Sequence, residues 1–297
     1  MKNFFKIAGV VALLLLVYSL LQGLFMILAL GGYVIYGATT ETMEPKALSE
    51  IYVFKEYGAD AMSISLFLSA ITMLVFIHVK KLFCIRKTLF TSIALKPLLL
   101  STALVMTAIY TFNVLVQWLP RENLLESEFD VMSHTVIGAL TISVIAPVLE
   151  EVMFRGAIQG YMMRHMRSPW AAMVAAALVF GIFHMNPVQV VYASLLGFVF
   201  GWLYYRTGSL MSVIVGHVLN NSLATILLLV LGKGNEFEIL NDHMSSEAAL
   251  ASEVVSFIFF GALTVYLAVK LHRSLPPVPS PWRESDEDVQ SVEEKEL

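Results

Sequence analysis

The sequence predicts an all-α, polytopic membrane protein with eight transmembrane helices. Of its 297 residues, 58% are hydrophobic and only 14% are charged, and the mean hydropathy is +0.75. An ordinary soluble domain is much less apolar. Apolar runs also recur at the length that crosses the hydrocarbon core of a bilayer, which takes about 20 helical residues. We therefore expect the lipid bilayer to surround most of the chain.

The first apolar run follows "MKNFFK" and resembles the start of a secretory signal. It is too long for one, however, and has no clear small-residue cleavage site, so it is interpreted as an uncleaved first span. Further runs of spanning length follow it along the chain. In order, the eight expected spans cover about residues 7–36, 62–79, 97–119, 134–154, 169–186, 188–205, 209–231 and 254–271.

The positions of the charged residues predict the orientation of these spans. Lysine and arginine gather at one set of helix ends, for example at Lys80, Lys81 and Arg86, whereas acids such as Glu236 and Glu238 dominate the opposite set. Cytoplasmic loops of membrane proteins carry the excess of Lys and Arg. Eight spans with both termini in the cytoplasm satisfy this rule at every loop.

The domain organisation follows from a change in composition near the C-terminus. Residues 1–273 are expected to form one integral membrane domain. Residues 274–297 read "SLPPVPSPWRESDEDVQSVEEKEL", which is rich in proline and then in acids and predicts a disordered acidic cytoplasmic tail. The single cysteine, Cys84, is interpreted as an ordinary free thiol. No phosphate-binding loop or basic nucleic-acid-binding face is present in the sequence, so no nucleic-acid partner is expected.

Five ionisable residues lie inside the predicted spans rather than at their ends: Glu150, Glu151, Arg155, His184 and His217. A charged side chain at the bilayer centre costs about 2.5–3.5 kcal/mol on insertion scales. Ionisable residues within membrane spans are therefore functional-site candidates. These five all fall between residues 150 and 217, which predicts one polar site between the fourth, fifth and seventh spans.

Helical spacing assigns different roles to the two adjacent acids. Glu151 and Arg155 are four residues apart, with the acid on the N-terminal side, which is the favourable order for an ion pair on one helix face. Glu150 points about 100° away around the helix and shares this partner less well. We expect Glu151 to be the structural member and Glu150 to take a proton from water. The alternative is an ion-paired helix end near the membrane interface.

His184 lies at the far end of the fifth span, in "VFGIFHMNP". If the fourth and fifth spans form a hairpin that turns near Arg167, Glu150 and His184 are equally far from the turn and lie at a similar depth. A carboxylate and an imidazole at the same depth can hold one water molecule between them. The alternative is a histidine that is merely hydrogen-bonded in the core.

His217 and Asn221 are four residues apart and share one face of the seventh span. An imidazole next to a carboxamide supplies two hydrogen-bond donors that can stabilise a developing oxyanion. Asn220 points about 100° away from Asn221 and is the less suitable partner. The alternative is that these side chains hydrogen-bond neighbouring helices to one another.

Three short segments resemble the signatures of the CPBP intramembrane proteases. "EEVMFR" matches Glu-Glu-x-x-x-Arg at Glu150, Glu151 and Arg155; "FGIFH" matches Phe-x-x-x-His ending at His184; "HVLNN" matches His-x-x-x-Asn starting at His217. This group includes the CAAX prenyl proteases of the Ras-converting type and bacterial proteins linked to bacteriocin processing or immunity. The resemblance covers about residues 135–228.

The resemblance implies a membrane endopeptidase that acts on a membrane-associated peptide or protein, in the cytoplasmic membrane of a bacterium. It implies that Glu150 and His184 activate water and that His217 and Asn221 line the oxyanion site, supported by Glu151 and Arg155. It leaves the cofactor open between zinc, for which Glu150, His184 and His217 would be the ligands of a metalloprotease, and none. The sequence contains no His-Glu-x-x-His pair.

Two other kinds of protein remain as alternatives. A non-catalytic membrane scaffold or bacteriocin-immunity protein would keep the same fold. A proton-coupled transporter would also contain buried glutamate and histidine residues along its ion path. The absence of an inverted repeat and the gathering of the ionisable residues at one site favour the protease over the transporter.

Overall fold

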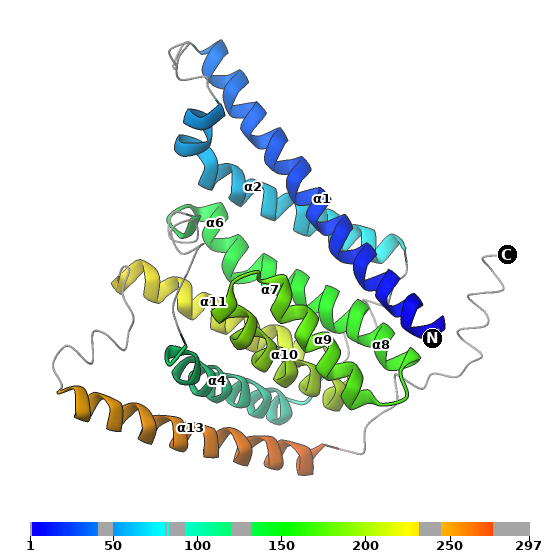
Figure 1. Cartoon of the computed structure of the whole chain (residues 1–297), viewed down its shortest axis with the longest axis vertical. Coiled ribbons are helices and arrows are strands. Elements are labelled where there is room, and N and C mark those ends of the chain that lie inside the picture. Colours follow the sequence, from blue (N-terminus) through cyan, green and yellow to red (C-terminus); the bar gives the residue numbers. More distant parts are fainter. Residues whose placement is uncertain are drawn as a thin grey trace.

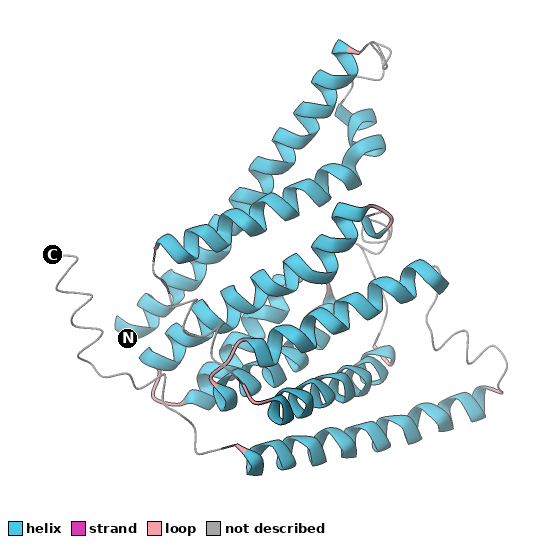
Figure 2. Ribbon diagram, turned by 180° about the vertical axis from the view of Figure 1, so that it is seen from behind, coloured by secondary structure: helices cyan, strands magenta, loops and turns pink. Residues whose placement is uncertain are grey.

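The computed structural model describes residues 2–40, 50–80, 82, 93–119, 132–231 and 245–275, and every regular element in these ranges is helical (Figure 2). Seven of the helices in these ranges are long and apolar enough to cross a membrane, and the fifth predicted span is a shorter apolar helix. The predicted all-α, polytopic fold class is therefore confirmed. Of the expected acidic tail, residues 274–297, everything after residue 275 lies outside the described residues.

The helices form antiparallel pairs on both sides of a central helix. α1 and α2 form a hairpin on one side, and α13 packs against α4 on the opposite side, with the α9–α10 hairpin and α11 between them (Figure 1). The central helix consists of five consecutive segments. The bounds are α1 (Lys2–Thr39), α2 (Glu50–Val79), α4 (Leu95–Gln117), α6 (Val136–Leu140), η2 (Thr141–Ile145), α7 (Ala146–Glu150), η3 (Glu151–Gln159), α8 (Gly160–His165), α9 (Pro169–Phe183), α10 (Pro187–Thr207), α11 (Met211–Leu231) and α13 (Ser246–Ser274).

The central helix is longer than the sequence suggests. The fourth span was expected to end near residue 154, but the helix continues through η3 and α8 to His165. Arg155 and Gln159 interrupt the apolar pattern there, yet both residues are only about 1% exposed. Carbonyl groups of α10 accept hydrogen bonds from both side chains, and Arg155 also pairs with Glu151. Hydropathy alone cannot recognise a buried polar residue that is satisfied by another helix.

The fifth span is shorter than expected. α9 ends at Phe183 rather than at residue 186, and His184 is its C-cap. Its 15 residues extend about 22 Å, less than the roughly 30 Å of a bilayer core. The next residue, Met185, has a positive φ of 53°. Asn186, which is 1% exposed, then caps α10 by accepting hydrogen bonds from the N–H groups of the second and third residues that follow it. This turn fixes the position of His184.

Two segments of the central helix, η2 and η3, are π-helical, with i→i+5 hydrogen bonds. π-Helical turns are rare and frequently occur at functional sites. η3 begins at Glu151 and all nine of its residues are buried. The wider turns therefore lie where the sequence places the motif of paired acids and arginine.

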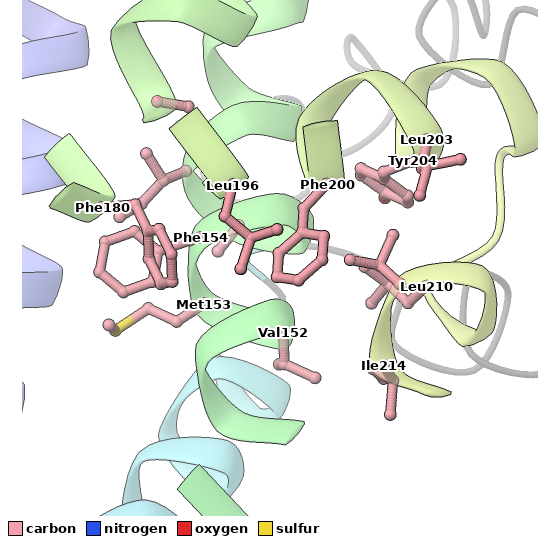
Figure 3. Close-up of a cluster of buried hydrophobic side chains, with 14 of the residues drawn as sticks. Val152, Met153, Phe154, Phe180, Leu196, Phe200, Leu203, Tyr204, Leu210 and Ile214 are labelled. Carbon is pink, nitrogen blue, oxygen red and sulfur yellow. The ribbon is translucent and has the colours of Figure 1, made fainter. Parts of the chain in front are cut away.

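A cluster of buried apolar side chains surrounds this part of the central helix. Figure 3 shows side chains of η3, α9, α10 and α11 packed together. Phe154, Phe180 and Phe200 are each at most 2% exposed, and the rings of Phe154 and Phe180 meet edge to face with centroids 5.0 Å apart. Lipid is as apolar as these side chains, so close packing rather than exclusion of water stabilises the contact.

Gly208 follows α10 in the left-handed conformation, with φ of 65°, and its N–H donates to the carbonyl of Tyr204 at 2.8 Å. A Cβ strains this conformation, so Gly208→Ala is expected to lower the free energy of unfolding by about 1 kcal/mol. Gly9 of α1 is a matched control, because a Cβ there would meet nothing within 4 Å. Unfolding in detergent tests both variants. Equal stability of Gly208→Ala and Gly9→Ala would contradict the expectation.

Candidate active site

Glu151 lies at the centre of a buried hydrogen-bonded chain. Its Oε1 is 3.0 Å from Nη1 of Arg155 and 2.7 Å from Nδ1 of His217. The Glu151 side chain is 0% exposed and that of Arg155 is 2% exposed. The ion pair expected from the spacing of four is therefore present. The second contact, from η3 across to α11, was not expected from the sequence.

Glu150 differs from its neighbour in both exposure and partners. Its side chain is 21% exposed, against 0% for Glu151, and its Oε2 lies 3.7 Å from Nε2 of His217. His217 therefore stands between the two acids, with one ring nitrogen toward each. An ionised Glu151 can only accept hydrogen bonds, so Nδ1 of His217 carries a proton.

The charges of this cluster determine where a further proton resides. Glu150 and Glu151 carry two negative charges, and Arg155 supplies one positive charge. Buried charges are costly unless they are paired. A second proton on Nε2 of His217, beside Glu150, brings the net charge of these four side chains to zero.

His184 is half-buried at the turn between α9 and α10. Its Nδ1 lies 2.9 Å from the carbonyl oxygen of Phe180, which can only accept. In the neutral ring Nε2 is then the nitrogen that can accept a hydrogen bond from water. The Phe180 ring contacts both histidine rings edge to face, with centroids 4.9 Å from His184 and 6.3 Å from His217. No ion pair joins Glu150 and His184 among the described residues, so the expected sharing of a water molecule stays a prediction.

The Asn221 carboxamide is held by two neighbours. Its Nδ2 donates to the carbonyl of Ile142 in η2 at 3.1 Å, and its Oδ1 accepts from Nδ2 of Asn220 at 2.9 Å. Asn220, which helical geometry had set aside, therefore orients the amide of Asn221. One N–H of Asn221 has no partner in these two bonds and can serve an incoming group.

Tyr18 of α1 is a neighbour of the site that sequence reasoning missed. It is 5% exposed, it interacts electrostatically with Glu150, and its ring centroid is 5.8 Å from that of Phe183. α1 lies outside the region that carries the motifs. A tyrosine within an apolar span gives no sequence signal that it faces a site rather than lipid.

The resemblance leaves a zinc ion open, with Glu150, His184 and His217 as its ligands. Among the described residues, no three histidine, cysteine, aspartate or glutamate side chains are arranged to hold one metal ion. Nδ1 of His217 is bonded to Glu151 and Nδ1 of His184 to a backbone carbonyl, which leaves Nε2 of each ring open, as in many metal-bound histidines. The relative placement of Glu150, His184 and His217, rather than the state of their ring nitrogens, is what does not fit a three-ligand zinc site.

Comparison with known proteins covers the same part of the chain. Residues 132–223 match the family described as type II CAAX prenyl endopeptidase Rce1-like. Over these residues, less than a third of the chain, it is similar to the CPBP family. The match includes all of the CPBP motif residues and excludes α1, α2, α4 and α13.

A curated relative supports this assignment. The protein "Putative membrane peptidase YdiL" of Bacillus subtilis (strain 168) is 28% identical over 100 residues, which are 34% of this chain and 41% of the relative. The alignment thus spans about two fifths of the relative's length. No solved structure matches the chain significantly. At the level of the CPBP family, both comparisons point to membrane peptidases.

Proposed function

We propose that this chain is an intramembrane endopeptidase that hydrolyses a peptide bond of a membrane-associated substrate with a water molecule activated by Glu150. The observation that carries the proposal is the unequal environment of the two acids. Glu151 is fully buried and bonded to Arg155 and His217, whereas Glu150 is partly exposed beside the same histidine. One acid orients the imidazole, and the other is free to act on water.

In the first step Glu150 takes a proton from water, and the hydroxide attacks the carbonyl carbon of the substrate. Nε2 of His184 is a second acceptor that orients this water. A partly exposed carboxylate in a largely apolar enclosure is a suitable general base.

The attack places a negative charge on the carbonyl oxygen. The protonated Nε2 of His217 and the remaining N–H of Asn221 are the donors that we assign to this oxyanion. These donors stabilise the oxyanion only if their orientation is fixed. Glu151 fixes the imidazole, and Asn220 fixes the carboxamide. Glu150 then returns its proton to the leaving amine as the carbon–nitrogen bond breaks, which completes the hydrolysis.

The substrate class follows from the membrane setting. Helices long and apolar enough to span a bilayer contribute all of these residues except His184, which caps the shorter α9, so the peptide is expected to reach the site from a lipid anchor or a membrane span. The matched family is described by its action on prenylated CAAX proteins. For this chain, a lipid-anchored peptide is a candidate substrate on that ground alone.

A comparison of membrane proteomes tests the proposal and names the substrate. Cells producing the parent are compared with cells producing Glu150→Ala, and Glu247→Ala, an exposed acid of α13, is the matched control. The parent and the control are expected to release the same new peptide termini, which are absent with Glu150→Ala. Identical termini in all three samples would exclude the protease.

A further inference from the structure

The side of α10 that faces η3 carries two glycines, Gly197 and Gly201. A Cβ at Gly201 would lie 2.6 Å from Oε1 of Gln159. A Cβ at Gly197 would lie 2.9 Å from the Phe180 ring and 3.3 Å from Nη2 of Arg155. Small residues spaced by four let helix backbones approach closely in membranes. The glycines therefore leave room for side chains of η3 to reach the backbone of α10.

Two polar side chains of η3 occupy this room. Nε2 of Gln159 donates to the carbonyl of Gly201 at 2.9 Å, and Nη2 of Arg155 donates to the carbonyl of Gly197 at 3.5 Å. The two donors are four residues apart in η3, and the two acceptors are four residues apart in α10. The two hydrogen bonds therefore join parallel segments at successive turns. A carbonyl oxygen has two lone pairs and can accept such a bond in addition to a helical one. The bond of Gln159 is the shorter of the two.

The hydrogen bond from Arg155 to Gly197 is part of the proposed site. The Arg155 guanidinium lies over the rings of Phe180 and Phe200, 4.1 and 5.1 Å from their centroids, and pairs with Glu151. The stacking of the guanidinium and its long hydrogen bond to Gly197 only weakly restrain movement of η3 along the axis of α10. Among the described residues no charged side chain bonds to Gln159, and its hydrogen bond to Gly201 ties the end of η3 directly to the backbone of α10.

The π-helical geometry makes this tie important. π-Helices are rare and mostly limited to one turn, whereas η3 extends over nine residues, from Glu151 to Gln159. Contacts with neighbouring helices must maintain it. Relaxation of η3 to a regular α-helix would rotate Glu151 relative to His217 and break the 2.7 Å contact between them.

We propose that Gln159 is a positioning residue, whose bond to Gly201 fixes η3 against α10 and holds Arg155 and Glu151 in line with His217. Gln159 touches no reacting atom in this arrangement. The inference rests on the proposed function, because the aligned residues matter for catalysis only if His217 and Glu150 act on a peptide.

The test replaces Gln159 with methionine, which keeps the length and flexibility of the side chain but cannot donate. Gln117→Met is the matched control, because Nε2 of Gln117 in α4 is buried without a hydrogen-bond partner among the described residues. Two quantities are measured in detergent: the kinetics of peptide cleavage, and the ¹⁵N resonances of the His217 ring, assigned by their loss in His217→Ala.

Gln159→Met is expected to lower kcat about 10-fold with KM within about twofold, as for a misplaced catalytic group, and to shift the His217 resonances. Gln117→Met should change neither. If Gln159→Met does not fold, Gly201→Ala, which presses on the same side chain, should shift the resonances instead. A Gln159→Met protein that loses only thermal stability, with kcat and the resonances unchanged, would overturn the inference.

The resonances also separate the two proposals. If the parent cleaves no peptide, the proposed function fails, but a shift of the His217 resonances in Gln159→Met still supports the positioning role. Unchanged resonances in an active Gln159→Met protein remove the positioning role and leave the proposed function intact.

Discussion

Replacing Glu150 with glutamine is expected to lower kcat for peptide cleavage by about 10²- to 10⁴-fold, the usual contribution of a general base. The amide has the size of the acid but cannot take a proton from water. Glu150 is partly exposed, and its one ion pair among the described residues is with the neighbouring imidazole. The variant should therefore fold and bind substrate as the parent does, and KM should change little.

Steady-state kinetics with the substrate named by the proteomic comparison measure this effect. Thermal unfolding of the same preparations shows whether the loss is catalytic, and Glu247→Gln, at an exposed acid of α13, controls for the change in charge. Cleavage by Glu150→Gln within about twofold of the parent would show that another group activates the water.

The sequence predicted the bounds of three helices well. α4, α10 and α11 begin and end within about two residues of the expected spans, since the spanning length and the flanking charges determine them. The prediction failed at the C-terminal end of the central helix and at the end of α9, and α2 and α13 begin 12 and 8 residues before the expected starts at residues 62 and 254. In the central helix polar side chains bond to α10, and at the end of α9 they bond to the local backbone. A one-dimensional hydropathy pattern contains neither kind of contact.

The site was predictable where spacing along one helix decides the contact. The pair of Glu151 and Arg155 follows from a separation of four residues. The contact between Glu151 and His217 joins residues 66 positions apart, so it depends on how α11 packs on η3. The spacing to Arg155 set Glu151 apart as the structural acid, but nothing in the local pattern showed that His217 would contact both acids.

Replacing Arg155 with methionine is expected to have the largest effect on stability, a loss of about 3–5 kcal/mol in the free energy of unfolding. Methionine fills part of the space between Phe180 and Phe200 but leaves the Glu151 carboxylate buried without its cation. Oε2 of Glu151 already has no hydrogen-bond partner among the described residues. Only His217 remains to compensate the charge.

Reversible unfolding in mixed detergent measures this loss, and two further variants identify its cause. Arg155→Lys keeps the charge but loses the planar, stacked guanidinium, so it should be intermediate. The double variant Arg155→Met, Glu151→Gln removes both charges and should recover part of the loss. If the double variant is less stable than Arg155→Met by the full cost of a second independent substitution, the ion pair is not the cause.

A double-mutant cycle between Glu150→Gln and His217→Ala tests most directly the claim that these residues act together on one water molecule. Residues that act as a unit have strongly non-additive effects on catalysis. Turnover by the double variant should be close to that of the slower single variant. If the two losses multiply, or if the parent itself cleaves no peptide, then the two groups do not form one hydrolytic site.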